Sequence, residues 1–268
     1  MNYSLFCLTA REREETADVL TDCGKIRKFL IKILLLMAEE RATIRIYLLD
    51  EFRKLPRGGS RRDDCLRGDR MNKVYDVLII GGGVVGSAIA REMARNKLSI
   101  GVLEKNLDVC YETSGRNSGV VHGGFAYDPG TLKAACCVEG NIGFDQLAEE
   151  LDIPFSRCGK VLVGNTEEDM ATLKRTIEQG KVNGARDLRL IDKEELHRLV
   201  PAVVGEFAMF SPNSGIVDPF KYTIALAENA AQNGVEYFFD HEVTDIHYNG
   251  EEIYEITTTR GVFKTRWV

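Results

Sequence analysis

Val74-Tyr75-Asp76-Val77-Leu78-Ile79-Ile80-Gly81-Gly82-Gly83-Val84-Val85-Gly86 is the stretch that decides the fold of this 268-residue chain. Its first seven residues are mostly β-branched or apolar, which is typical of a strand buried on both faces of a parallel sheet. Glycines at 81, 83 and 86 then follow the pattern G-x-G-x-x-G. Residues 84–96 predict a helix and residues 98–103 a second strand. The whole pattern therefore predicts a β-α-β unit.

The three glycines have different roles in such a unit. Gly81 lets the chain turn sharply, Gly83 removes a side chain where a pyrophosphate approaches the backbone, and Gly86 lets the helix pack closely on the strand. The helix N-terminus then offers free amides and a positive dipole end to the phosphates. Glu104 ends the second strand, where its carboxylate can accept hydrogen bonds from the hydroxyls of an unphosphorylated ribose. These residues predict a dinucleotide site, and a glycine-rich turn with a surface glutamate is the alternative.

The next loop bears on the choice between NAD and FAD. Residues 113–124 read Thr-Ser-Gly-Arg-Asn-Ser-Gly-Val-Val-His-Gly-Gly, where an NAD domain normally places another β-α unit. Its many backbone and hydroxyl donors suit the pyrophosphate, ribityl chain and ring of a flavin. FAD is the predicted cofactor, and an NAD-dependent dehydrogenase stays as the weaker alternative.

Later segments predict further helices and strands. Thr166, followed by acidic residues, begins one helix, and Asp218-Pro219 begins another that ends at Asn233-Gly234. A tight turn near residues 249–250 indicates an antiparallel meander. The strand-like runs expected to form it are residues 235–240, 243–248, 252–259 and 262–268.

Composition excludes several classes of protein. The chain is 44% hydrophobic and 28% charged, and no apolar run approaches 18 residues, so it is globular without a predicted membrane span. A net charge of -6 gives no electrostatic reason to expect nucleic-acid binding. The seven cysteines show no zinc-ligand spacing and no paired framework, so no metal site is predicted and a reducing cytoplasm fits best. Cys136 and Cys137 are interpreted as small buried apolar side chains.

Residues 1–70 differ from the rest in having charged, glycine-bearing segments without clear periodicity. They are interpreted as an extension or linker, with an accessory helical segment at residues 12–52 as the alternative. A peripheral membrane contact through residues 25–48 is a further alternative.

On these motifs the chain resembles the D-amino-acid-oxidase-type FAD-dependent oxidoreductases. The resemblance rests on the glycine motif with Glu104, on the loop 113–124, and on Asp-Pro-Gly-Thr-Leu-Lys-Ala at 128–134. Within that family the chain is most similar to anaerobic-type glycerol-3-phosphate dehydrogenases and L-2-hydroxyglutarate oxidases. The similarity covers residues 73–268 and none of residues 1–70.

The resemblance implies an α/β fold in which a Rossmann-like FAD-binding domain, a parallel sheet plus an antiparallel β-meander, is interrupted by a partial α+β substrate domain. The expected boundaries are 71–144 for the first part of the FAD domain, 145–218 for the substrate domain, and 219–268 for the incomplete return. Family members continue beyond the meander, so the chain is interpreted as a fragment.

The family chemistry is oxidation of a C–H bond beside a hydroxyl or amine, with hydride passing to flavin N5. His122 is the candidate base, and a neutral histidine that orients the glycine loop is the alternative. Arg116 is a candidate for contact with a cofactor phosphate or a substrate carboxylate, with a solvated or locally paired side chain as the alternative. Arg157 and Lys160 are candidates for steering an anionic substrate, with a surface strand as the alternative. The other histidines, at 197, 241 and 247, are interpreted as solvated. The expected cofactor contacts are Gly81, Gly83, Gly86, Glu104, Thr113, Ser114, Asn117, Ser118, Gly119 and Val243.

Asn117 and Ser118 have an Asx-type turn as their alternative role.

Two functions follow for the chain as a whole. The preferred one is a flavoenzyme that oxidises glycerol 3-phosphate or a small L-2-hydroxy acid, and the other is a non-catalytic remnant that keeps only the dinucleotide-binding unit. The expected electron acceptor is oxygen, a quinone or a partner protein.

Overall fold

The computed structural model describes residues 73–250 and 252–268, so the expectations for residues 1–70 lie outside the described part. Within it, six strands form one mixed sheet in the order β10-β11-β12-β1-β2-β9. Their bounds are β1 Val74–Ile80, β2 Ile100–Leu103, β9 Glu236–Phe238, β10 Val243–Tyr248, β11 Tyr254–Thr258 and β12 Gly261–Trp267. Helix α4 (Val84–Met93) joins β1 to β2, which pair in parallel. The predicted β-α-β unit is confirmed.

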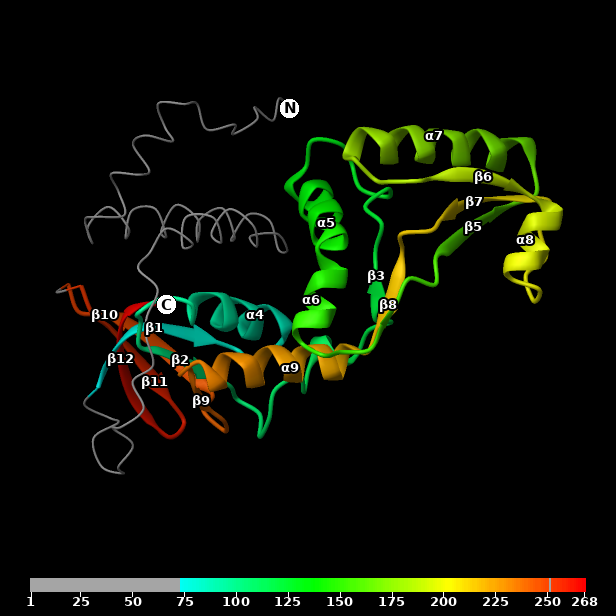
Figure 1. Cartoon of the computed structure of the whole chain (residues 1–268). Helices are drawn as coiled ribbons and strands as arrows, with labels where there is room; N and C mark the ends of the chain where they lie inside the picture. Colours follow the sequence, from blue (N-terminus) through cyan, green and yellow to red (C-terminus); the bar gives the residue numbers. More distant parts are fainter. Residues whose placement is uncertain (1–72, 251) are drawn as a thin grey trace.

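The meander contains β10, β11 and β12, each antiparallel to the next. The run 235–240 was expected there as well, and that prediction was wrong. Its strand β9 pairs in parallel with β2, opposite Gly101 to Leu103, because the preceding helix α9 (Pro219–Gln232) returns the chain to that edge. Strand β12 has a second role, since its other edge pairs in parallel with β1. The parallel and antiparallel parts therefore form one continuous sheet (Figure 1).

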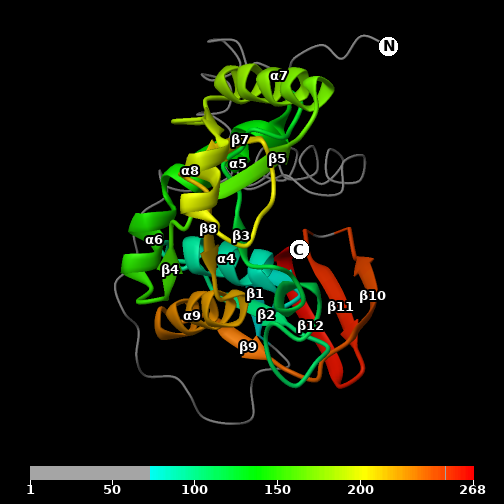
Figure 2. The same ribbon diagram turned by 90° about the vertical axis from the view of Figure 1, so that its right-hand side faces the viewer.

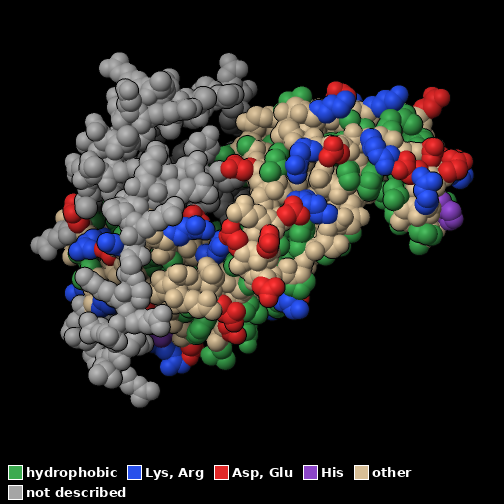
Figure 3. All heavy atoms as spheres, viewed as in Figure 1, with side chains coloured by type: hydrophobic (Ala, Val, Ile, Leu, Met, Phe, Trp, Pro, Cys, Tyr) green, Lys and Arg blue, Asp and Glu red, His purple; other side chains and the backbone are tan. Residues whose placement is uncertain are grey.

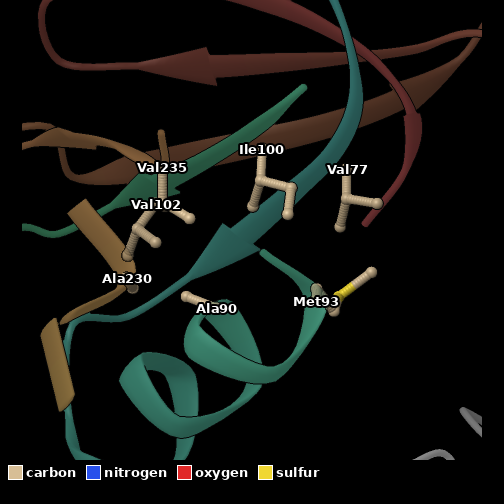
Figure 4. Close-up of a cluster of buried hydrophobic side chains, with 7 residues drawn as sticks. All are labelled: Val77, Ala90, Met93, Ile100, Val102, Ala230 and Val235. Atoms are coloured by element: carbon tan, nitrogen blue, oxygen red, sulfur yellow. The ribbon is translucent and has the colours of Figure 1, made fainter. Parts of the chain in front are cut away.

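Two helices cover one face of this sheet. Ala90 and Met93 of α4 and Ala230 of α9 pack against the strand residues Val77 and Val102 (Figure 4). Ala90 and Ala230 are fully buried, and such small side chains let the helices approach each other and the sheet closely. The packing fixes the N-terminal end of α4 at the carboxyl end of β1. A second cluster joins β1 and β2 to the meander through Tyr75, Leu78, Leu103, Ile256 and Phe263.

The other lobe contains two small antiparallel sheets (Figures 1 and 2). One has the order β5-β7-β6 and is covered by helix α7, and the other has the order β3-β8-β4 and lies nearer the large sheet. Their strands are β3 Val120–Val121, β4 Phe155–Ser156, β5 Lys160–Gly164, β6 Arg189–Asp192, β7 Phe207–Ser211 and β8 Gly215–Val217. The helices are α5 Leu132–Ile142, α6 Phe144–Glu150, α7 Glu167–Asn183 and α8 Lys193–Leu199. The expected α/β fold with an inserted α+β part is confirmed, while the domain boundaries stay a prediction.

The predicted helix starts are confirmed by their caps. Thr166 and Asp169 form a capping box at α7, and the Asp218 carboxylate accepts hydrogen bonds from the amides of Phe220 and Lys221 at α9. These caps satisfy amides that the first helical turn leaves without partners.

The surface and the cysteines complete the description. Acidic and basic side chains are interspersed on the face of the α7 lobe seen in Figure 3. None of the helices within residues 73–250 and 252–268 combines the length and apolar character that a bilayer crossing requires. The interpretation of Cys136 and Cys137 as buried was wrong, since both are half-buried in α5, and Cys158 is exposed. Cys110 alone among the described cysteines is buried.

Candidate cofactor and active site

The glycine loop has the geometry that its spacing predicts. Gly81 has φ +102°, a conformation that favours glycine, and it turns the chain out of β1. Gly86 lies so close to this turn that a side-chain carbon there would fall 2.0 Å from the Gly81 carbonyl oxygen. A carbon at Gly83 would fall 2.9 Å from Ser114 Oγ, so the loop 113–124 passes directly over the glycine turn.

The N-terminus of α4 begins directly after the glycine turn. Its N-cap is Gly83, which gives no side-chain cap, and its first turn holds no acidic residue. The amide of Val84 donates to Ser114 Oγ at 2.9 Å, which puts a hydroxyl at the helix end. The first turn therefore brings no carboxylate of its own to the positive end of the helix dipole, which favours a phosphate there.

Glu104 faces this loop and is 7% exposed, so the alternative of a surface glutamate was wrong. Its Oε2 accepts from the Gly82 amide at 2.6 Å, and its Oε1 accepts from the backbone and side-chain nitrogens of Asn106 at 2.8 Å. A carboxylate oxygen has two lone-pair directions. These three hydrogen bonds therefore fix the carboxylate and leave one acceptor position, on Oε2. The glycine turn and the acidic end of β2 thus form one site.

Val243 is brought near the same point. The amide of His241 donates to the Glu104 carbonyl at 2.9 Å, and the amide of Asp240 donates to the Asn106 carbonyl at 2.9 Å. Val243 begins β10 two residues later and is half-buried against the sheet. Its contact with adenine stays a prediction.

The loop after β2 is held by its own side chains. Asn117 Oδ1 accepts from the Gly119 amide at 2.9 Å, and its Nδ2 donates to the carbonyls of Thr113 and Ser114. The first of these bonds is the Asx turn considered as the alternative for Asn117. Ser118 and Thr113 are exposed, and their contacts with a flavin stay predictions. The Gly119 carbonyl accepts from the Val217 amide at 2.9 Å, which ties the loop to β8.

His122 follows β3 and is exposed, and among the described residues its imidazole has no hydrogen bond. The loop is held through the His122 carbonyl instead, which accepts from Asn141 Nδ2 at 3.0 Å and from Cys137 Sγ at 3.5 Å. Burial lowers the pKa of His122, and the charges of Lys160 and Lys133 lower it further. A neutral imidazole at ordinary pH can accept a proton, so the geometry suits a base.

Arg157 was expected as a candidate for substrate contact, but it is used inside the protein. Its guanidinium donates to Asp145, to both oxygens of Asn141, and to the Asn213 carbonyl. The hydrogen bond from Arg157 lowers the pKa of Asp145. Asn141 is buried and also donates to the Asn213 carbonyl at 2.8 Å. Because Asn141 also donates to the His122 carbonyl, this network holds the backbone of the His122 loop. Motif reasoning missed it because its members are far apart in sequence.

The structure also shows the surroundings of Arg116 and of the other three histidines. Arg116 is exposed and lies 3.9 Å from Glu112, as expected for a local pair. His197 and His247 are exposed, as predicted. His241 is not simply solvated, since its ring packs edge-on against Phe238 and Phe263.

The geometry described so far agrees with comparisons to known proteins. Residues 76–268 match the family described as FAD dependent oxidoreductase, DAO. The chain belongs to this family. It is 38% identical over 197 residues to a glycerol 3-phosphate dehydrogenase of Caloramator mitchellensis, covering 73% of this chain and 41% of that protein.

Two further comparisons are with a curated relative and with a solved structure. The chain is 42% identical over 173 residues to the mitochondrial L-2-hydroxyglutarate dehydrogenase of Nematostella vectensis, covering 64% of this chain and 38% of that protein. The structure resembles L-alpha-glycerophosphate oxidase from Mycoplasma pneumoniae with FAD bound, with a TM-score of 0.68, 29% identity, and coverage of 72% and 53%. The chain spans about two fifths of the length of the curated relatives it matches.

Proposed function

We propose that this chain binds FAD and takes part in the oxidation of a small anionic hydroxy substrate, either glycerol 3-phosphate or an L-2-hydroxy acid. The observation that carries the proposal is the single site formed by the N-terminus of α4, the buried carboxylate of Glu104 and the Ser114 hydroxyl. An amide-lined helix end beside a fixed carboxylate suits a pyrophosphate followed by an unphosphorylated ribose. These groups fit the adenosine diphosphate part of FAD.

The residues of the site have separate proposed roles in binding and in proton transfer. Gly81, Gly83 and the first turn of α4 bind the phosphates, and Glu104 orients the ribose. When bound, FAD supplies the acceptor for the hydride that leaves the substrate carbon. The neutral imidazole of His122 removes the hydroxyl proton, so that the C–H and O–H bonds are lost and a carbonyl forms. The choice of substrate follows the substrates named for the relatives.

The residues of the site also support one competing function. Glu104, Ser114 and the first turn of α4 suit the adenosine diphosphate part alone, so the competing function is a non-catalytic dinucleotide-binding protein. A cytoplasmic location stays part of the proposal, on the ground of the described free cysteines.

Purification of the full chain with added FAD separates these functions. The proposal expects a yellow protein whose flavin absorbance is bleached without oxygen by glycerol 3-phosphate or L-2-hydroxyglutarate. The same experiment with His122→Asn is expected to give bound flavin and little bleaching. A yellow protein that neither compound bleaches supports the non-catalytic function, and a preparation that stays colourless with FAD contradicts the proposal.

A further inference from the structure

We propose that Lys133 and Lys160 form the site that binds the acid group of the substrate, on either side of the His122 side chain. The inference rests on the proposed function and deepens it, since it assigns residues to the anionic end of the substrate. The ligand chemistry is an oxyanion, either a phosphate monoester or a carboxylate.

The first argument comes from one stripe of helix α5. Lys133, Cys137 and Asn141 are spaced four residues apart and therefore share a helix face. Cys137 and Asn141 both contact the carbonyl oxygen of His122, at 3.5 and 3.0 Å. Lys133 is the next residue along the same stripe, one helical turn before Cys137. Its Nζ also stacks on the Tyr127 ring, 4.5 Å from the ring centroid.

The second lysine reaches the same loop from another element. Lys160 begins β5 and is the register partner of Ser211 in β7. A side-chain carbon at Gly123 would lie 2.8 Å from Ser211 Oγ, so the residue after His122 touches that strand pair directly. The Nζ of Lys160 lies 5.8 Å from the centroid of the Phe125 ring, which belongs to the same loop. Helix α5 and strand β5 thus each bring a cation to an aromatic ring of the segment that follows His122.

Charge is the third argument. Within residues 73–250 and 252–268, neither ammonium lies within 4.0 Å of a carboxylate oxygen, whereas twelve other such contacts join basic and acidic side chains there. Burial raises the pKa of the Cys137 thiol, and burial also raises the pKa of Tyr127, so both neighbours are neutral at ordinary pH. Both lysine charges act on His122 in the direction that lowers its pKa. Two unpaired cations beside an exposed base suit an anionic ligand.

The consequence for chemistry is a division between the two ends of the substrate. The acid group would lie between the ammonium groups, and the hydroxyl would point to the imidazole. Binding of the anion neutralises the local positive charge and so raises the pKa of His122, which strengthens it as a base once substrate is present.

The test follows the imidazole of His122 by nuclear magnetic resonance in the full chain without FAD. The chain has four histidines, and His122→Gln assigns the signal. Inorganic phosphate, glycerol 3-phosphate and L-2-hydroxyglutarate are the titrants, and their relative affinities distinguish a phosphate monoester from a carboxylate. Each is expected to raise the pKa of His122 as it binds.

Variants then locate the binding. Lys133→Gln and Lys160→Gln should each raise the pKa of His122 in the free chain and weaken the tightest titrant about threefold to tenfold. Lys133→Arg and Lys160→Arg keep the charge and should retain binding. Lys174→Gln removes the same charge from the exposed face of α7 and should change neither quantity.

Two outcomes would overturn the inference: no titrant changes the His122 signal, or Lys174→Gln weakens binding as much as the other two variants do. The measurement needs no flavin. A chain that binds the anion but fails to bind FAD would contradict the proposed function and leave this site standing.

Discussion

Gly86→Ala is the substitution for which the structure gives the sharpest expectation. The new carbon would lie 2.0 Å from the Gly81 oxygen and 3.2 Å from its carbonyl carbon, against an ordinary contact of 3.4–4 Å. The backbone of the turn or of α4 must therefore move by roughly 1.4 Å, because neither contact atom belongs to a flexible side chain. Overpacking of this kind costs about 1–3 kcal/mol, and a clash between two backbone segments places the cost at the upper end.

The assay is urea unfolding followed by circular dichroism, together with FAD titration. We expect the free energy of unfolding to fall by about 2–3 kcal/mol and FAD affinity to fall at least about tenfold, since the displaced turn carries the phosphate-binding amides. Gly140→Ala is the matched control, since Gly140 is an exposed position within α5 with nothing within 4 Å of the new carbon. It should raise the free energy of unfolding by about 1 kcal/mol. Wild-type stability and FAD affinity in Gly86→Ala would refute the close approach of the turn to α4.

Three further predictions test other parts of the site. Ser114→Ala removes the hydroxyl that accepts from the Val84 amide, and FAD titration should show about tenfold weaker binding with a loss of about 1 kcal/mol in stability. Arg157→Met breaks the network of Asp145, Asn141 and Asn213 and should lower the free energy of unfolding by about 1–3 kcal/mol, whereas Lys193→Met breaks only an exposed ion pair and should leave it unchanged. The pKa of His122 is below its ordinary value of 6.5, so the unfolded chain binds more protons just below pH 6.5 and stability should fall as pH falls from there through the lowered pKa. Urea midpoints measured from pH 5 to 8 should show a smaller slope in His122→Gln, and an unchanged slope would remove His122 from this account.

Local signals in the sequence were enough to predict the glycine turn and two of the helix starts. The turn at Gly81 and the close packing at Gly86 follow from spacing within one β-α-β unit, and both are visible in the structure. Glu104 lies beside the same turn, and its contact with a ribose stays a prediction. Helix starts at Thr166 and Asp218 were predictable for the same reason, because a cap acts on amides two or three residues away.

What the sequence could not supply depends on pairing between distant segments. Strand β9 looks like any other short apolar run, and only the register of Gly101 with Glu236 places it in the parallel part of the sheet. The support of His122 by Asn141, and of Asn141 by Arg157, joins three elements that no short motif connects. Asn117 was assigned to the flavin as a small donor. In the structure its Oδ1 accepts from the Gly119 amide in an Asx turn and its Nδ2 donates to two carbonyls of its own loop, while its contact with a flavin stays a prediction.

Titration of the purified full chain with FAD, and in parallel with FMN, tests the central claim most directly. FMN lacks the adenosine monophosphate part that Glu104 and the N-terminus of α4 are expected to hold. The account predicts that FAD binds, that ADP competes with it, and that FMN binds far more weakly. Equal binding of FMN and FAD, or FAD affinity unchanged by Glu104→Gln, would contradict it.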